Sequence, residues 1–273
     1  MRITDFHTHA FPDDLAHRAM TRLSEHANGK KAVLDGTVSD LLRSMDAAGI
    51  YRSVLCSVAT APKQFDPILA FSDRVRSDRI IPFPSFHPDS PDLAALVRRV
   101  GASGFLGVKL HPCYQGFAPD EDRFLPMYEA AVDERLIIVF HAGWDFAFPE
   151  DWMSRPERIA KVARRFPDLL IVAAHMGGYR RWEDSLAHLA DLPNVYFETS
   201  FSLDELPRPL LDVLIARKGD RRILFGTDSP WRDQTDSLRI LRALDLHPLT
   251  TTRILEENAA DLLEGRPSRE KCA

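Results

Sequence analysis

The chain has 273 residues, of which 45% are hydrophobic and 27% are charged, and its formal net charge at pH 7 is −5. This composition is typical of a globular protein, and the length suits one large α/β domain or two small ones. The negative charge argues against a nucleic-acid-binding protein, which normally presents a basic face. We expect a cytoplasmic protein without membrane contact, because there is no bilayer-spanning apolar run, no signal-peptide core and only three scattered cysteines.

Apolar runs and turn residues predict strands and helices that alternate along the chain. A polar stretch, 10–36, follows the first strand and suits a flap over a site. Ser39 and Gly49 are typical of a helix start and a helix end, and Ser90-Pro91 is typical of another start. The expected strands are 2–6, 53–58, 79–86, 104–110, 136–140, 169–174, 195–199 and 222–225. The expected helices are 15–26, 39–49, 66–77, 90–100, 122–134, 156–166, 181–190, 206–218, 233–244 and 250–263.

The expected strands are continuous apolar runs, as is typical of parallel strands buried on both faces. Eight strands alternating with helices over ~250 residues predict an α/β fold, the eightfold TIM (β/α)8 barrel. A doubly wound open sheet is the alternative, but it would require a glycine-rich phosphate loop after an early strand, which the sequence lacks. We therefore expect a single barrel domain over residues 1–264, followed by a polar tail, 265–273.

Residues that can bind metal follow several expected strands. His7 and His9 are two apart at the end of the first strand, so they point to one face. His141, His175 and Asp228 follow the fifth, sixth and eighth strands. In such a barrel the carboxyl ends of the strands meet at one mouth, and imidazoles with a carboxylate suit zinc, manganese or iron(II). The sequence therefore predicts a divalent metal site, with zinc favoured.

A bound divalent ion would activate water for attack on a carbonyl-type bond. Asp228 could ligate the ion and carry the proton, while His175 could stabilise the developing oxyanion or bind a second ion. Asp228 could instead be an N-cap, since Thr-Asp-Ser-Pro is good capping chemistry. His141 or His175 could be an ordinary core histidine, although both follow successive strands.

Five segments resemble the amidohydrolase superfamily, and most closely the amidohydrolase-related group that contains aminocarboxymuconate-semialdehyde decarboxylase. The segments are Asp5-Phe-His-Thr-His9, Gly107-Val-Lys-Leu-His-Pro112, Val139-Phe-His-Ala-Gly143, Ala174-His-Met-Gly-Gly178 and Phe225-Gly-Thr-Asp-Ser-Pro-Trp231. The likeness spans nearly the whole chain.

The resemblance implies four metal ligands, His7, His9, His141 and Asp228, and a catalytic role for His175. In two-metal branches, the strand-six histidine binds the second ion and a carboxylated lysine from strand four bridges the two. Lys109 occupies a comparable place, so a binuclear centre stays open, although we favour one ion.

Loop residues after the strands are candidates for substrate contact. Trp144 could form an apolar wall, and Arg180 or Arg232 could grip a carboxylate through a bidentate fork. His111 shares a face of strand four with Lys109 and could contact substrate or pack in the loop.

We expect an enzyme acting on a small molecule. The first hypothesis is a metal-dependent hydrolase of an amide, ester or lactone. The alternatives are a non-oxidative decarboxylase or other lyase of a small unsaturated or aromatic carboxylic acid, and a barrel that binds metal and ligands without turnover. A homo-oligomer is compatible with all three.

Overall fold

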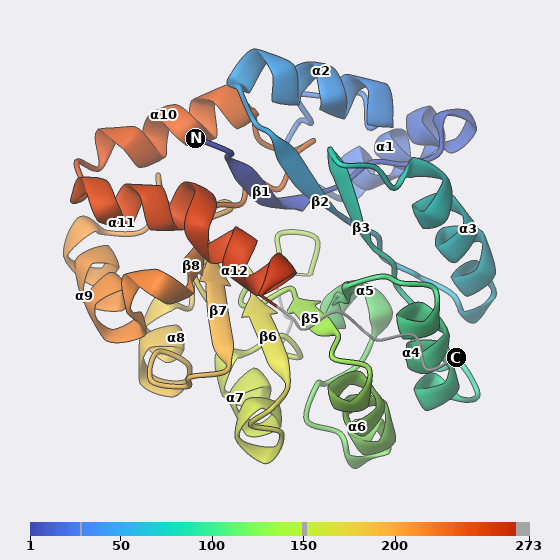
Figure 1. Ribbon diagram of the computed structural model, residues 1–273. Coiled ribbons are helices and arrows are strands. Elements are labelled where there is room, and N and C mark those ends of the chain that lie inside the picture. Colours follow the sequence, from blue (N-terminus) through green and yellow to red (C-terminus); the bar gives the residue numbers. More distant parts are fainter. Residues whose placement is uncertain (28, 149–151, 266–273) are drawn as a thin grey trace.

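The computed structural model describes residues 1–27, 29–148 and 152–265. Its strands form a parallel barrel, which confirms the fold predicted from the sequence (Figure 1). Two ladders run in the orders β1-β2-β3 and β4-β5-β6-β7-β8. The strands are β1 Thr4–Thr8, β2 Arg52–Cys56, β3 Ile80–Phe83, β4 Gly107–Leu110, β5 Ile137–Phe140, β6 Leu170–Ala173, β7 Val195–Glu198 and β8 Ile223–Leu224.

Backbone hydrogen bonds join the two ladders into a closed barrel. The Phe6 N–H donates to the Phe225 carbonyl oxygen at 2.7 Å, which ties β1 to the end of β8. The Lys109 N–H donates to the Pro84 carbonyl oxygen at 3.0 Å, which ties β4 to the end of β3. Residues from the two ends of the chain therefore meet on one side of the barrel.

Helices surround the strands (Figure 1). They are α1 Asp13–His26, α2 Val38–Ala48, α3 Phe65–Val75, α4 Leu93–Ala102, α5 Pro112–Gln115, α6 Leu125–Asp133, α7 Pro156–Arg165, α8 Trp182–His188, α9 Arg208–Lys218, α10 Gln234–Ala243, α11 Pro248–Thr252 and α12 Asn258–Glu264. Short 3-10 turns are η1 Pro62–Gln64, η2 Asp122–Phe124 and η3 Asp220–Arg222, and η4 Arg253–Glu257 is a π-helical turn.

Several predicted boundaries were wrong. The N-cap of α2 is Thr37 rather than Ser39, because Thr37 directly precedes the first helical residue and its side chain accepts from the Asp40 N–H. Gly49 does end the helix, with a φ of 70°. The cap of α4 is Asp92 rather than Ser90. The helix expected over 250–263 is divided into α11, η4 and α12, and α5 had not been expected. The predicted tail, apart from Gly265, lies outside the described residues.

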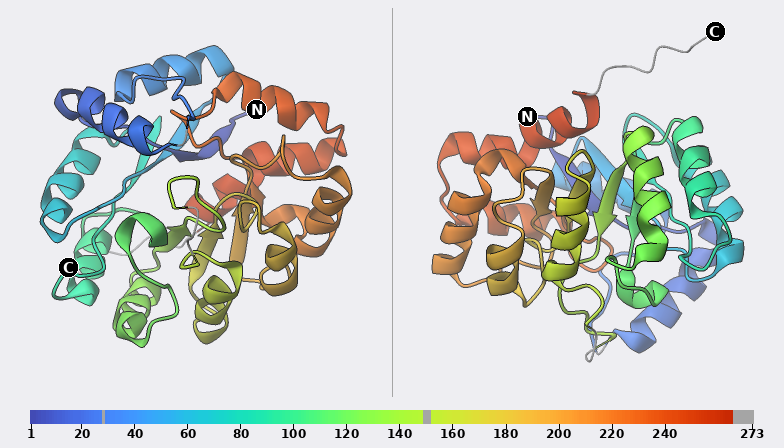
Figure 2. Two further views of the ribbon diagram at one scale, coloured as in Figure 1. Left: turned by 180° about the vertical axis from the view of Figure 1, so that it is seen from behind. Right: turned by 90° about the horizontal axis from the view of Figure 1, so that it is seen from below.

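α12 closes one end of the barrel. Its Ala259, Leu262 and Leu263 belong to the apolar cluster inside the barrel, which also holds Phe6 and Val139. Figure 1 shows α12 lying across the strands, and Figure 2 shows the opposite end, seen from behind. Because the interior is filled and α12 covers one end, a site formed by residues at the strand ends is accessible from the other end, where the strand-to-helix loops lie.

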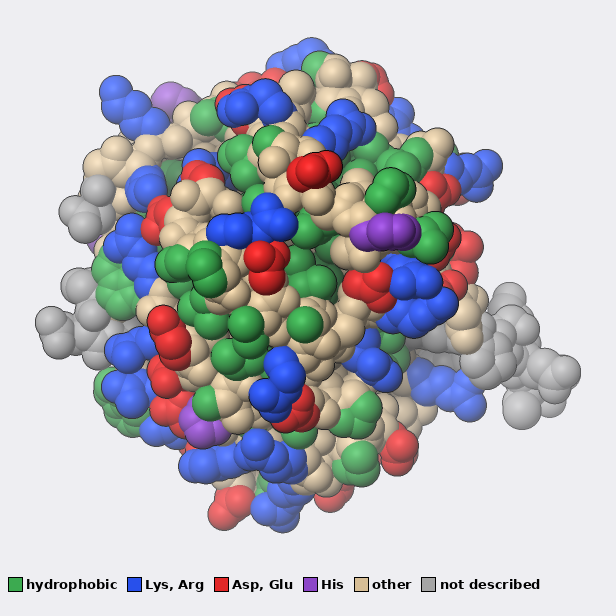
Figure 3. Space-filling view, turned by 90° about the vertical axis from the view of Figure 1, so that its left-hand side faces the viewer, with side chains coloured by type: hydrophobic (Ala, Val, Ile, Leu, Met, Phe, Trp, Pro, Cys, Tyr) green, Lys and Arg blue, Asp and Glu red, His purple; other side chains and the backbone are tan. Residues whose placement is uncertain are grey.

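One face of the outer surface carries charged side chains of both signs among hydrophobic ones (Figure 3). On the face over α9 to α11, Lys and Arg side chains alternate with Asp and Glu (Figure 3). Among the residues that the structure describes, no helix is both long and apolar enough to cross a bilayer.

Candidate metal centre

Three side-chain atoms that can bind a metal ion meet where β1 and β8 end; we call His7, His9 and Asp228 the ligand cluster. His9 Nε2 lies 2.9 Å from Asp228 Oδ1, His7 Nε2 lies 3.4 Å from the same oxygen, and the two Nε2 atoms are 3.1 Å apart. Ligand atoms that bind one ion at about 2.0–2.2 Å are separated by roughly 3–3.5 Å. His9 and Asp228 keep 17% and 14% of their side-chain surface exposed, so a small molecule can reach this cluster.

The hydrogen bonds of Nδ1 in His7 and His9 determine that Nε2 of each ring is unprotonated. His7 Nδ1 lies 3.0 Å from Glu198 Oε1, and His9 Nδ1 lies 2.7 Å from the Cys56 carbonyl oxygen. A carboxylate and a carbonyl accept hydrogen bonds, so each Nδ1 carries the proton and each neutral ring directs a lone pair from Nε2. Two lone pairs and the Asp228 carboxylate therefore face one point, an arrangement that suits a divalent cation.

Burial sets the charge of these groups. The pKa values of His7, His111 and His141 lie well below the usual histidine value, chiefly because burial disfavours the charged ring. Burial alone would raise the pKa of the Asp228 carboxyl, but His7 and His9 outweigh it and hold that pKa below its usual range. Neutral imidazoles with an ionised carboxylate are the forms that bind metal.

The backbone holds Asp228 and His175 in the left-handed region. Their φ angles are 62° and 60°, an uncommon conformation for residues other than glycine. The Asp228 N–H donates to the His7 carbonyl oxygen at 2.8 Å, and the Trp182 indole N–H donates to the His175 carbonyl oxygen at 3.1 Å. Such conformations cost about 1–3 kcal/mol each and cluster at functional sites, so these turns are typical of a site rather than of an ordinary loop.

Asp5 anchors the turn that carries Asp228. Its fully buried carboxyl accepts from the Thr227 hydroxyl at 2.6 Å and the Gln234 amide at 2.8 Å. The N–H groups of His7 and Thr227 also donate to it. Burial raises the pKa of Asp5 to about 7, against the opposing effect of these donors.

His175 connects the cluster to His141. The His175 and His7 rings are 5.4 Å apart, and His175 Nε2 lies 3.0 Å from His141 Nδ1. Among the described residues, His141 groups with His111 and Asp145 rather than with the three-ligand cluster. The His111 and His141 rings stack in parallel at 4.1 Å. Because an ion cannot lie in the planes of two rings stacked this way, we assign no second metal to that group.

Lys109 lies at the edge of the cluster. It is fully buried, and its Nζ lies 3.1 Å from His7 Nε2. The geometry thus brings Lys109 to the same atom that faces His9 and Asp228, where a carboxylated lysine could also reach a metal. Whether it is carboxylated stays a prediction.

The predicted substrate-binding arginines lie on the outer rim in ion pairs. The Arg180 guanidinium donates to Glu205 at 2.8 and 3.0 Å and lies over the Trp144 ring at 5.1 Å. Arg232 pairs with Asp204 at 2.7 Å. His111, the fourth candidate, is buried against His141. Trp144 and Arg232 therefore connect to His175 through the rings of Tyr179 and Phe201, rather than by direct contact with the metal-ligand side chains.

A family model described as "Amidohydrolase" matches residues 4–265. The chain belongs to this amidohydrolase family. It is an enzyme of the amidohydrolase superfamily, as the motifs at the strand ends predicted. No curated protein matches the chain.

Solved structures share the fold of this amidohydrolase. An uncharacterized TIM-barrel protein from Bordetella bronchiseptica is 22% identical with a TM-score of 0.78, covering 97% of this chain and 100% of that chain. A 5-carboxyvanillate decarboxylase from Novosphingobium aromaticivorans, complexed with manganese and 4-hydroxy-3-methoxy-5-nitrobenzoic acid, is 16% identical with a TM-score of 0.68, covering 96% and 95%. A 2,6-dihydroxybenzoate decarboxylase from Rhizobium is 18% identical with a TM-score of 0.66, covering 96% and 98%.

Sequence analysis missed Glu198, Ser200 and Asp145 in this amidohydrolase. Glu198 is completely buried at the end of β7 and contacts His7, and Ser200 contacts His175. The signal was available, because Glu198 ends an otherwise apolar strand and Ser200 follows it two residues later. The rule that identified the other strand ends would have selected them. Asp145, by contrast, lies in a loop whose path the sequence does not indicate.

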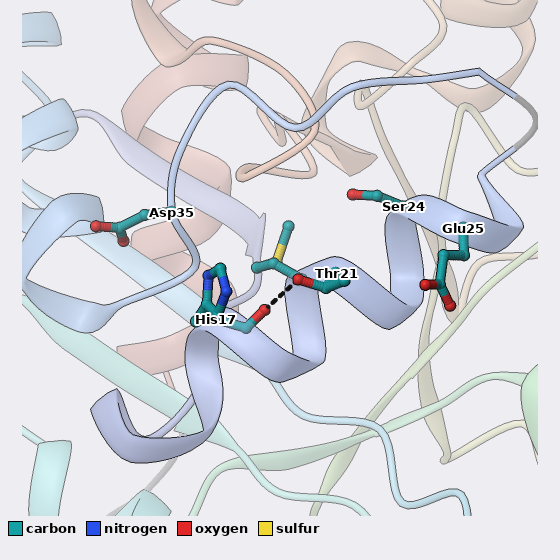
Figure 4. Close-up of a pocket in the computed structure, with 6 residues that line it drawn as sticks. His17, Thr21, Ser24, Glu25 and Asp35 are labelled. Atoms are coloured by element: carbon teal, nitrogen blue, oxygen red, sulfur yellow. Dashed lines mark hydrogen bonds between the residues drawn. The ribbon is translucent and has the colours of Figure 1, made fainter.

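Two hollows lie outside the ligand cluster. One of about 570 Å³ runs along α1 and is lined by His17, Thr21, Ser24 and Glu25 from that helix and by Asp35 from the following loop (Figure 4). The other, of about 180 Å³, is lined partly by Phe201, Trp231 and Arg232. Neither is lined by the ligand residues, so we locate the site by its side-chain chemistry rather than by cavity size.

Proposed function

We propose that this amidohydrolase is a metal-dependent, non-oxidative decarboxylase of a small aromatic or unsaturated carboxylic acid. The observation that carries this proposal is a set of aromatic rings that reaches His175. The sequence favoured hydrolysis of an amide, ester or lactone, because the metal ligands alone do not distinguish the two reactions. The aromatic rings favour the alternative.

The rings come from loops after successive strands. Phe201 lies 6.2 Å and Tyr179 lies 6.1 Å from the His175 ring, measured between centroids. Phe146 extends the set, at 5.9 Å from Phe201 and 6.4 Å from Trp231. Trp144 joins it at 6.1 Å from Tyr179. A flat, unsaturated substrate can stack or pack edge-on against such a wall.

The fold relatives agree with this proposal. Two of the solved structures described above are decarboxylases of hydroxybenzoate-type acids, and one holds manganese. At identities of 16% and 18% they establish the fold, and their chemistry supports the proposal without identifying the substrate.

The residues that would hold the ion are His7, His9 and Asp228. His141 lies beyond them and contacts His175, whose Nε2 is 3.0 Å from His141 Nδ1. A divalent ion bound there would supply a positive charge that attracts and orients an anionic substrate. Both manganese and zinc accept imidazole and carboxylate ligands, so metal analysis decides between them.

We assign proton delivery to His175. The pKa of Asp228 is held below its usual range, so this carboxyl stays ionised and does not donate a proton readily. In the proposed step, His175 in its doubly protonated form gives one proton to the carbon that bears the carboxylate, where a C–H bond forms, and the ring returns to its neutral form. The C–C bond then breaks, carbon dioxide leaves, and its bonding electrons return to the unsaturated system.

The test is an assay of the metal-loaded enzyme on a panel of hydroxybenzoates and unsaturated acids, with carbon dioxide release as the readout. We expect release from at least one aromatic acid, lost after chelation and restored by manganese or zinc. The same preparation is tested on lactones, esters and amides. Hydrolysis of these, without carbon dioxide release from any acid, would overturn the proposal in favour of a hydrolase.

A further inference from the structure

Glu198 and Ser200 form a buried pair behind the two histidines that face the site. Both side chains are almost completely buried; Glu198 is the last residue of β7, and Ser200 lies two residues after it. Nothing in the proposed reaction requires them to touch substrate. They nevertheless contact both His7 and His175, which are far apart in the sequence.

The Glu198 carboxylate is filled by donors. Its Oε1 accepts from the His175 backbone N–H at 2.9 Å and from the Ser200 hydroxyl at 2.7 Å, and lies 3.0 Å from His7 Nδ1. Its Oε2 accepts from the Ser200 N–H at 2.8 Å. Backbone N–H groups can only donate, so the carboxylate acts as the acceptor throughout. His7 must therefore hold its proton on Nδ1.

The Ser200 hydroxyl likewise determines which ring nitrogen of His175 carries the proton. Its hydrogen is directed to Glu198, so its oxygen is left to accept from His175 Nδ1 at 2.8 Å. The Ser200 carbonyl oxygen, also an acceptor, lies 3.2 Å from that nitrogen. Both partners of His175 Nδ1 accept, so a neutral His175 ring carries its proton on Nδ1 and leaves Nε2 bare.

The surrounding backbone makes room for this pair. Gly226 lies against the carboxylate, and a Cβ at that position would collide with Glu198 Oε2. The Met176 N–H donates to the Glu198 carbonyl oxygen at 2.7 Å, so the left-handed turn at His175 is fixed to the same residue. One carboxylate thus orients a ring, a hydroxyl and a strained turn together.

We propose that Glu198 and Ser200 are positioning residues that set matching tautomers on His7 and His175, with Nδ1 protonated and Nε2 bare on each. Glu198 acts directly on the metal ligand, and Ser200 extends its effect to the proton-carrying histidine. Outer partners of metal-ligating histidines typically change metal affinity or activity by 10–100-fold when removed. The role of His175 in turnover rests on the proposed decarboxylase function, whereas the tautomers do not.

The experiment compares Glu198→Gln and Ser200→Ala with Tyr128→Phe. The control also removes one buried hydroxyl, which donates to the Pro119 carbonyl oxygen at 2.8 Å in the outer layer. Two readouts need no substrate. Histidine ¹⁵N NMR of the metal-free protein reports which ring nitrogen is protonated, assigned with His7→Gln and His175→Gln spectra. Competition with a chromophoric chelator gives the Zn²⁺ dissociation constant.

We expect Glu198→Gln to weaken Zn²⁺ binding by about 10–100-fold and to shift His7 away from the Nδ1-protonated form. Ser200→Ala should shift only His175, change Zn²⁺ affinity by less than about threefold, and lower kcat with little change in KM on any substrate found. Tyr128→Phe should match the wild type in every readout. If Glu198→Gln does not fold, Ser200→Ala alone decides the tautomer of His175. Folded variants that keep both wild-type tautomers would overturn the proposal, even if the decarboxylase assay succeeds. A failed substrate panel with shifted tautomers would overturn the proposed function alone.

Discussion

The ligand cluster and the rim of this barrel are both rich in charge, but they hold it differently. In the cluster, His7 is almost completely buried, and each of its ring nitrogens has a fixed neighbour from another strand. On the rim, Arg180 and Arg232 keep 48% and 29% of their side-chain surface exposed and pair with Glu205 and Asp204. Buried groups cannot exchange partners for water, whereas rim groups can.

This difference in burial predicts that the cluster controls metal binding and catalysis, whereas the rim controls which substrate is preferred. A change in the cluster leaves a buried polar atom without a partner, which is costly, so we expect it to affect metal binding and stability together. A change on the rim replaces a solvent-exposed ion pair, which contributes about 0–1 kcal/mol. We therefore expect rim changes to alter substrate preference, to change stability little and to leave metal binding unchanged.

The largest effect is expected at Asp228. Asp228→Ala removes the only carboxylate of the three-ligand group and leaves His7 and His9 without their shared partner. We expect metal occupancy to fall below detection and turnover to fall at least ~10³-fold. Asp228→Asn should retain some metal and lose most of the turnover. The measurements are metal content after dialysis and the rate on the best substrate.

Asp168→Ala is the matched control, because Asp168 is an exposed carboxylate before β6. It should leave metal content and rate unchanged. An Asp228→Ala enzyme with normal turnover would contradict the role given to Asp228, and it would also contradict the contrast between cluster and rim.

A smaller effect is expected at Gly226. Gly226→Ala places a methyl group against the Glu198 carboxylate, which has no free space. We expect a loss of unfolding free energy of about 1–3 kcal/mol, together with weaker metal binding because His7 loses its orienting partner. Denaturant unfolding and chelator competition measure the two effects. A stable variant with unchanged metal affinity would show that Glu198 can move freely.

Lys218 shows what burial does to a charged side chain whose hydrogen bonds go to backbone carbonyl oxygens. Its Nζ donates to the carbonyl oxygens of Leu189 and Leu192 at 2.9 and 2.8 Å, and burial lowers its pKa to about 7. Above pH 7 the folded protein has lost this proton while the unfolded chain keeps it, up to its ordinary value of 10.5, so stability rises with pH in that window. Relative to Lys218→Met, the wild type should gain ~2 kcal/mol between pH 7 and pH 9. Parallel pH dependences in urea unfolding would contradict this.

The smallest effect on stability is expected on the rim. Arg180→Ala and Arg232→Ala should each change the unfolding free energy by about 0–1 kcal/mol and leave metal content unchanged. If either arginine grips the substrate carboxylate, KM should rise while kcat changes less. A loss above ~2 kcal/mol, or loss of metal, would place that arginine in the buried machinery instead.

The fold was predictable because it depends on local signals that repeat along the chain. The apolar run 136–140 matches β5, Ile137–Phe140, to within one residue, whereas the runs 79–86 and 104–110 each extend three residues beyond one end of β3 and β4. The positions of Asp228 and His175 at strand ends were equally predictable, since parallel strands end at one mouth. Helix caps were less predictable, because Thr37 and Ser39 are chemically similar and their distances to the helix decide between them.

The support behind the ligands was harder to predict. Glu198 lies 191 residues from its partner His7, so no local pattern connects them. Likewise, the separation between His141 and the three-ligand cluster depends on ring orientations, which follow from the packing of His111 and His175. The pairing of Arg180 with Glu205 depends on loop paths, which sequence patterns do not specify.

An anomalous-scattering crystal structure of the metal-loaded protein tests the central claim most directly. It should show a metal peak within bonding distance of His7 Nε2, His9 Nε2 and an Asp228 oxygen, and the same map reveals whether Lys109 is carboxylated. A fully loaded crystal whose only metal peak lies away from these three side chains would contradict the account.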